Sequence, residues 1–154
     1  MKKTTLLLAV SIIACTSNFS VEGADEHPYV QRIASIRAPD IDIKQGTVQE
    51  IFEYLRLKSR DWDPEPEPAM KGFTLITLSL ALDDIKEYSY KVSNVSMGQV
   101  FQDLAMLMQI DFHITNIGVV ATAPNQPPFP NAKASGGAVF KTYRAAGERV
   151  EKGG

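Results

Sequence analysis

The sequence is most tightly constrained by a pattern that occurs twice, 49 residues apart. Residues 47–55, TVQEIFEYL, align with residues 96–104, SMGQVFQDL. Each copy begins with a hydroxyl residue that is followed three positions later by Glu or Gln, and this capping box opens many helices. Apolar residues then recur at the i, i+3, i+4 and i+7 spacing of one helical face. The sequence therefore predicts two amphipathic helices, over residues 47–59 and 96–109.

Strands are predicted before and after these helices. Residues 40–44 and 88–93 alternate apolar or aromatic residues with polar ones, which indicates strands with one buried face. A longer apolar alternation predicts a strand over 73–82. Residues 111–115 and 119–123 read as a hairpin around the loop Asn116-Ile117-Gly118.

The order of these elements is βα-ββ-α-ββ, in which helices and strands mix without strict alternation. That order predicts an α+β fold of two helices packed with small mixed sheets, with a weak internal duplication. We expect the aromatic residues on the inward side of each element to form the core: Phe52, Tyr88, Tyr90, Phe101 and Phe112.

The regions around this module are less regular. Residues 16–35 read as a tether with one short helix near its end, and the module itself spans 36–123. Residues 124–154 read as a flexible tail with a possible strand at 139–143, because the rest is rich in Gly, Ala and charge. Within the module, 61–68 alternates Pro with acids, so it is expected to be an extended loop.

The first fifteen residues resemble a bacterial signal peptide. Lys2 and Lys3 supply the positive start, and residues 4–14 are eleven uncharged, mostly apolar residues. A run of this length is too short for a membrane span, which needs roughly 20 residues. Export from the cytoplasm is therefore predicted.

Cys15 ends this leader and is the sole cysteine of the chain. The run Ile12-Ile13-Ala14-Cys15 resembles a lipobox, which predicts lipidation of Cys15 and a membrane anchor. Thr16, where some lipoproteins carry Asp, favours the outer membrane over the inner one. The alternative is cleavage near residues 21–23, which would remove Cys15 and leave a soluble periplasmic or secreted protein.

Charge and motif content argue against several functions. Without the leader lysines the chain carries 14 basic and 18 acidic residues, so it lacks the basic surface that nucleic acid requires. No phosphate loop, nucleophile motif or metal-ligand spacing is present, and we expect no catalysis, metal or cofactor. His113 is expected to be a solvated or edge histidine, because strand alternation turns it away from Phe112 and Ile114.

Trp62 and its acidic neighbours are the candidate binding residues. Trp62 is the sole tryptophan and lies beside Asp61 and Asp63 in the predicted loop. Exposed, it would anchor a partner; folded back, it would cap the core. The acids of this loop are more readily explained as a solvated segment than as a calcium site, and they would favour a basic partner.

The pattern resembles the secretin/TonB short N-terminal domain of bacterial envelope proteins. The resemblance covers about residues 36–123 and depends on the first predicted strand and helix, on Thr77-Leu78-Ser79-Leu80, and on Val92-Ser93-Asn94-Val95-Ser96 before the second helix. It implies a periplasmic docking domain without catalysis. The chain departs from the family in its longer Pro-acidic loop, and no large membrane β-structure follows in these 154 residues.

These observations predict a protein-docking module in the bacterial envelope whose partner is another envelope protein. The alternative is a structural envelope domain with no partner beyond its own copies. An enzyme of unknown type ranks third.

Overall fold

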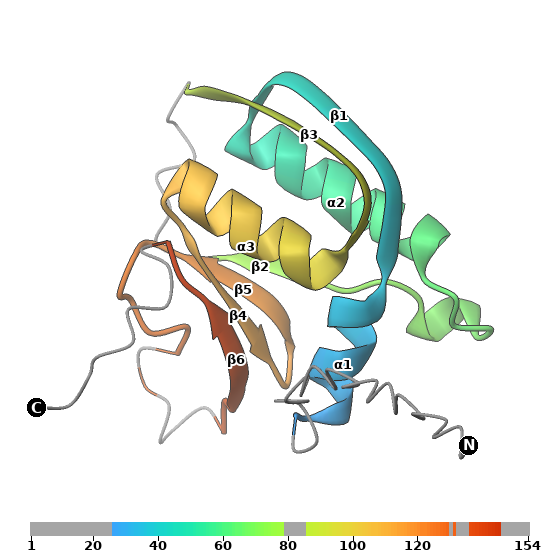
Figure 1. Cartoon of the computed structure of the whole chain (residues 1–154). Coiled ribbons are helices and arrows are strands. Elements are labelled where there is room, and N and C mark those ends of the chain that lie inside the picture. Colours follow the sequence, from blue (N-terminus) through green and yellow to red (C-terminus); the bar gives the residue numbers. More distant parts are fainter. Residues whose placement is uncertain (1–25, 79–85, 130, 132–135, 146–154) are drawn as a thin grey trace, which may run out of the picture.

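Two small β-sheets enclose a pair of helices (Figure 1). A computed structural model of the chain describes residues 26–78, 86–129, 131 and 136–145. The first layer is a two-stranded antiparallel sheet, which pairs β1 (Arg37–Thr47) with β3 (Glu87–Ser96). The middle layer holds α2 (Val48–Trp62) and α3 (Met97–Met108). The α+β fold predicted from the sequence is confirmed.

The third layer is a four-stranded sheet in the order β2-β5-β4-β6. Its strands are β2 (Leu75–Thr77), β4 (Asp111–Thr115), β5 (Gly118–Thr122) and β6 (Val139–Tyr143). The pair β2 and β5 is parallel, whereas β4 is antiparallel to both of its neighbours. The outer strands of this sheet are therefore β2 and β6, and α1 (Pro28–Ser35) packs beside α3.

The duplication seen in the sequence is an approximate two-fold symmetry of the backbone. Thr47 and Ser96 are the N-caps of α2 and α3, and each hydroxyl accepts a hydrogen bond from the third helical N–H. Gln45 and Asn94, two residues earlier, share a positive φ of 54°. The matched left-handed residues give each strand the same local bend before its helix.

The pairing of β1 with β3 places the symmetry axis. Asp42 lies opposite Lys91, and these two residues occupy equivalent positions of the repeat. Their side chains form an ion pair of 3.0 Å on the polar outer face of the sheet. The two repeats therefore meet at their own central strand residues, and the two helices lie on the same side of the sheet (Figure 1).

The helices bury their predicted faces against the four-stranded sheet. Phe112 of β4 lies between the equivalent residues Phe52 and Phe101, with ring centroids 5.6 and 5.2 Å away. Tyr88 and Tyr90 of β3 are also buried, so the predicted aromatic core is confirmed. The core is continuous from one sheet through the helices to the other.

Several element boundaries differ from the prediction. The helix α2 continues to Trp62 instead of ending at 59. It ends there because Pro64 disfavours a helical conformation at the residue before it, Asp63. The predicted extended loop therefore begins two residues later, and it ends in a short 3₁₀ helix, Pro68–Met70. The strand predicted over 73–82 is regular at Leu75–Thr77, and residues 79–82 lie outside the described residues.

The two capping boxes are also unequal. Glu50 Oε2 accepts from the backbone N–H of Thr47 at 2.8 Å, which completes the first box. In the second repeat Gln99 does not reach back, because its Nε2 donates instead to Asp103 Oδ1 at 2.7 Å. The prediction of a complete second box was wrong.

The compact body is larger than the predicted 36–123. Val30 and Ile33 of α1 are fully buried in the core, and β6 completes the large sheet at the strand proposed for 139–143. In the hairpin, β5 begins at Gly118, so the turn contains Asn116 and Ile117 alone. Residues 1–25, with the leader and Cys15, lie outside the described part of the chain.

Candidate docking groove

A groove runs along one side of α2, beside the edge strand β2. Its first part is a hollow of about 250 Å³ between α2 and the side chains of Leu75 and Thr77. Its second part, about 400 Å³, shares Arg56 with the first and continues between Arg60 and the segment 69–74. We call the two parts together the α2–β2 groove; its helical wall consists of Gln49, Phe52, Glu53, Arg56 and Arg60.

The backbone of β2 has its free side at this groove. The Leu78 N–H donates to the Ala121 carbonyl, and the Thr74 carbonyl accepts from the Val119 N–H. Backbone groups alternate in direction along a strand, so Leu75 and Thr77 point their N–H and C=O groups away from β5. The described residues place no strand on that side of β2. An unpaired edge of this kind is a template for an added strand.

The other strand edges are guarded differently. β1 contains Pro39, which cannot donate, and it alternates charged residues on its outer face. β6 is contacted by the chain at the start of α1, where the His27 ring stacks on Phe140 with centroids 3.8 Å apart. Lys141 of β6 also forms an ion pair with Glu26. Both β2 and β6 border a hollow, but the start of α1 covers β6, whereas the free edge of β2 lies beside Phe52 and Leu75 in the first part of the groove.

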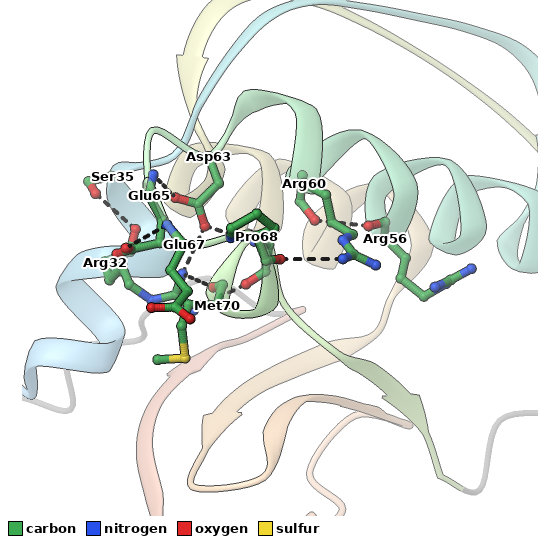
Figure 2. Close-up of polar contacts among 11 residues, drawn as sticks. Arg32, Ser35, Arg56, Arg60, Asp63, Glu65, Glu67, Pro68 and Met70 are labelled. Carbon is green, nitrogen blue, oxygen red and sulfur yellow. Dashed lines mark hydrogen bonds and ion pairs between the residues drawn. The ribbon is translucent and has the colours of Figure 1, made fainter.

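A polar cluster that we call the Arg32–Asp63 clasp holds one end of the groove (Figure 2). Arg32 of α1 donates from Nη1 to Asp63 Oδ2 and to the Met70 carbonyl, both at 2.8 Å, and from Nη2 to the Gly72 carbonyl at 3.1 Å. Asp63 also accepts from the backbone N–H groups of Gly72 and Glu65. The clasp therefore ties α1, the end of α2 and the following loop together.

Gly72 lets the loop pass close to α2. Its φ is +72°, and a Cβ there would lie 2.7 Å from Arg60 Cγ and 2.8 Å from Ser59 Oγ. Both the backbone conformation and the close approach require glycine. As a result the segment around Lys71 packs against the Arg60 stem, and both residues line the second part of the groove.

The charges of the groove are unevenly paired. Arg56 holds Glu53 with two hydrogen bonds, of 2.6 and 2.9 Å, and these bonds lower the pKa of the Glu53 carboxyl. Arg32 is paired with Asp63. No carboxylate of the described residues lies within 4.0 Å of the cationic groups of Arg60 or Lys71. The second part of the groove therefore carries two cations that no described carboxylate pairs.

The side chains of the three candidate binding residues have different partners and do not form one site. Trp62 is the last residue of α2, and its partly buried ring packs against Tyr54 with centroids 6.2 Å apart, as in the core interpretation. Asp61 is exposed on the helix and pairs with Lys58 at 3.7 Å. Asp63 is 2% exposed and belongs to the clasp. The loop placement of Asp61 and Trp62 was wrong, because both residues are helical.

His113 corrects another prediction. It is 5% exposed and lies in β4, an inner strand, so it is neither solvated nor at an edge. Its Nδ1 lies 2.9 Å from Thr142 Oγ1, and its Nε2 lies 3.0 Å from Thr122 Oγ1. Burial lowers the pKa of His113. The residues around Gln126 fold over this face of the sheet, and the strand pattern alone could not reveal that cover.

The α2–β2 groove was not predicted from the sequence. Its helical wall consists of residues 49, 52, 53, 56 and 60, which are polar or charged apart from one aromatic residue, and this pattern is typical of a solvent-exposed helix face.

Within the described ranges, no three His, Cys, Asp or Glu residues gather to hold a metal ion. None of the helices in that part of the chain is long and apolar enough to cross a bilayer.

Comparison of the chain with protein-family models, with curated proteins and with solved structures gives no match. The resemblance to the secretin/TonB short N-terminal domain therefore stays a prediction.

Proposed function

We propose that the protein is a docking module of the bacterial cell envelope that binds an extended segment of another envelope protein in the α2–β2 groove. The observation that carries this proposal is the free edge of β2 beside a helical wall. A segment added to β2 would bond to the outward N–H and C=O groups of Leu75 and Thr77. Its side chains on one face would enter the hollow above Phe52, and these contacts would select the partner.

The chemistry of the groove favours binding over catalysis. Its carboxylate, Glu53, is held by Arg56 and has a lowered pKa, so it is a poor proton acceptor near neutral pH. The remaining polar groups of its first part are the Gln49 amide and the Thr77 hydroxyl. We therefore propose a non-catalytic role that needs no cofactor or metal.

The test replaces one backbone donor at the free edge. Thr77→Pro removes an outward N–H without removing a bond to β5, whereas Thr77→Val keeps the N–H and nearly the same volume. After crosslinking in cells, the parent and Thr77→Val are expected to carry the same stoichiometric partner. Thr77→Pro is expected to lose it while keeping the parent's circular dichroism spectrum and melting temperature.

Two outcomes would contradict the proposal. Equal recovery of the partner with Thr77→Pro would show that β2 is not the docking edge. If the parent and both variants recover only the chain's own copies, the result would favour a structural envelope domain that self-associates.

The envelope location is proposed from the leader. We expect Cys15 to be acylated and to anchor the module, so Cys15→Ser should give unprocessed or soluble protein. Mass spectrometry of the mature N-terminus distinguishes the alternatives. A free terminus near Ala24 without an acyl mass would replace the outer-membrane lipoprotein with a soluble periplasmic or secreted protein.

A further inference from the structure

The second part of the α2–β2 groove has a charge that opposes the charge of the whole chain. The chain carries −2 overall, yet the side chains that line this hollow include four cations and no carboxylate. These cations are Arg32, Arg56, Arg60 and Lys71. Since the clasp and Glu53 neutralise the first two, the unpaired charge lies at Arg60 and Lys71.

Neither unpaired cation is committed to strong contacts within the described protein. Arg60 donates from Nη2 to the Pro68 carbonyl at 3.4 Å, near the limit of a hydrogen bond. Its stem is fixed against Gly72, so the guanidinium is held beside the residue that follows Lys71. The acids Glu65 and Glu67 do not line this hollow. Both cations are therefore available to an anionic group that enters this hollow.

We propose that the segment docked on β2 carries an acidic side chain that binds between Arg60 and Lys71. This inference rests on the proposed function, and it names the chemistry of the partner. The hollow follows directly from the β2 edge, since Lys71 lies four residues before Leu75. An extended segment that pairs with β2 covers that distance in about four residues, at roughly 3.3 Å per residue. The carboxylate would receive charge-assisted hydrogen bonds from both cations.

The partner's charge thus has the opposite sign from the one that the acidic loop suggested. That expectation placed Asp61 and Asp63 on a loop facing the partner. In the structure Asp63 is buried in the clasp, and Asp61 pairs with Lys58 on the helix.

The experiment selects binding peptides from a displayed library of short random sequences. The bait is the full chain, compared with the charge-reversed variants Lys71→Glu and Arg60→Glu. Lys58→Glu is the matched control, because it makes the same change on α2 outside the lining of the groove. Thermal melting verifies that each bait is folded, and Lys71→Glu avoids disturbing the Arg60 stem.

We expect the parent and Lys58→Glu to enrich peptides with alternating apolar residues and an Asp or Glu at one constant position. Lys71→Glu should enrich Lys or Arg at that position. A synthetic peptide from the parent selection should bind about tenfold more weakly when its acid is changed to the amide.

The two proposals fail separately. Enriched peptides without a constant acid, or with an acid that persists after charge reversal, would overturn this inference and leave docking on β2 standing. A parent bait that enriches no sequence pattern would remove the docking function and this inference together.

Discussion

The two halves of the molecule that carry the repeated pattern share a backbone but differ in what lies against their helices. In the second half, Gly98 of α3 lets α1 approach so closely that an added Cβ would lie 3.3 Å from Ala34 and 3.0 Å from the Tyr143 hydroxyl. In the first half, the equivalent residue is Gln49, and it lines the open groove. The small residue at this position of α3 therefore allows α1 to pack closely against it, whereas the larger Gln49 occupies the same position of α2.

The same difference appears in charge. Arg56 and Arg60 of α2 correspond to Ala105 and Gln109 of the second repeat. The hollow between α3 and β6 is also lined by two cations, but Lys141 forms an ion pair with Glu26, and Arg144 lies 4.0 Å from Asp111. In the α2–β2 groove, by contrast, no described carboxylate pairs with Arg60 or Lys71. The repeat therefore places each helix beside an edge strand with a hollow between them, and the two hollows differ in their side chains and in how their cations are paired.

The largest expected effect comes from the equivalent phenylalanines. Phe101 is fully buried and its ring lies near Phe73, Phe112 and Tyr143, so Phe101→Ala should lower the free energy of unfolding by about 5 kcal/mol. Phe52 borders the groove and its ring pairs with Phe112 alone among the described aromatic contacts, so Phe52→Ala should cost about 3 kcal/mol. Urea unfolding measures both. Equal losses would show that the second repeat is not the more enclosed one.

The Arg32–Asp63 clasp gives the next largest effect. It lies at the end of α2, and the described residues place no such cluster at the end of α3. Asp63→Ala leaves Arg32 without its carboxylate and removes the acceptor of two backbone N–H groups, so it should cost about 2–3 kcal/mol. Hydrogen exchange should also increase at Gly72 and Glu65. If stability falls without faster exchange at these amides, the clasp does not order the loop beside the groove.

The stability that the N-caps of α2 and α3 contribute should depend differently on pH. Thr47→Ala and Ser96→Ala should each cost about 1 kcal/mol at neutral pH. The backbone N–H of Thr47, followed by its hydroxyl, lowers the pKa of Glu50, so this contribution to stability is present above the ordinary Glu pKa. It is lost as the pH falls through the lowered pKa.

Gln99, at the equivalent position, does not titrate. The cost of Thr47→Ala should therefore decrease in acid, while the cost of Ser96→Ala should not follow the same titration. Urea unfolding across the acidic range verifies this, and parallel pH profiles for the two variants would contradict it.

The smallest effect concerns the matched positive-φ residues. Gln45→Gly should stabilise the fold by about 0.5–1 kcal/mol, because glutamine is strained at a φ of 54°. Asn94→Gly should give no gain, because asparagine tolerates this conformation and its Oδ1 accepts from Arg37 at 3.0 Å. Thermal melting compares the two substitutions, and an equal gain at both would contradict this account of the strand bends.

The features that were predicted correctly from the sequence are those that depend on local patterns. Caps and apolar spacing located both helices and their buried faces, since these signals lie within a few residues of one another. The α2–β2 groove, the clasp and the burial of His113 depend on contacts between distant segments. Arg32 meets Asp63 across 31 residues, and His113 meets Thr142 across 29, so no local window contains either pair. The end of α2 was misplaced because Asp61 was grouped with the prolines that follow it.

The central claim is that the α2–β2 groove is the docking surface, and site-specific photocrosslinking in the cell that makes the protein tests it most directly. A photoreactive residue at Gln49 or Thr77 lies in the groove, whereas one at Leu57 or Lys58 lies on the same helix outside its lining. Leu57 is 51% exposed and apolar, so it controls for nonspecific crosslinking at an accessible apolar residue. The account predicts one discrete adduct with an envelope protein from the groove positions and none from Leu57 or Lys58. An adduct from the control positions with none from Gln49 and Thr77 would contradict it.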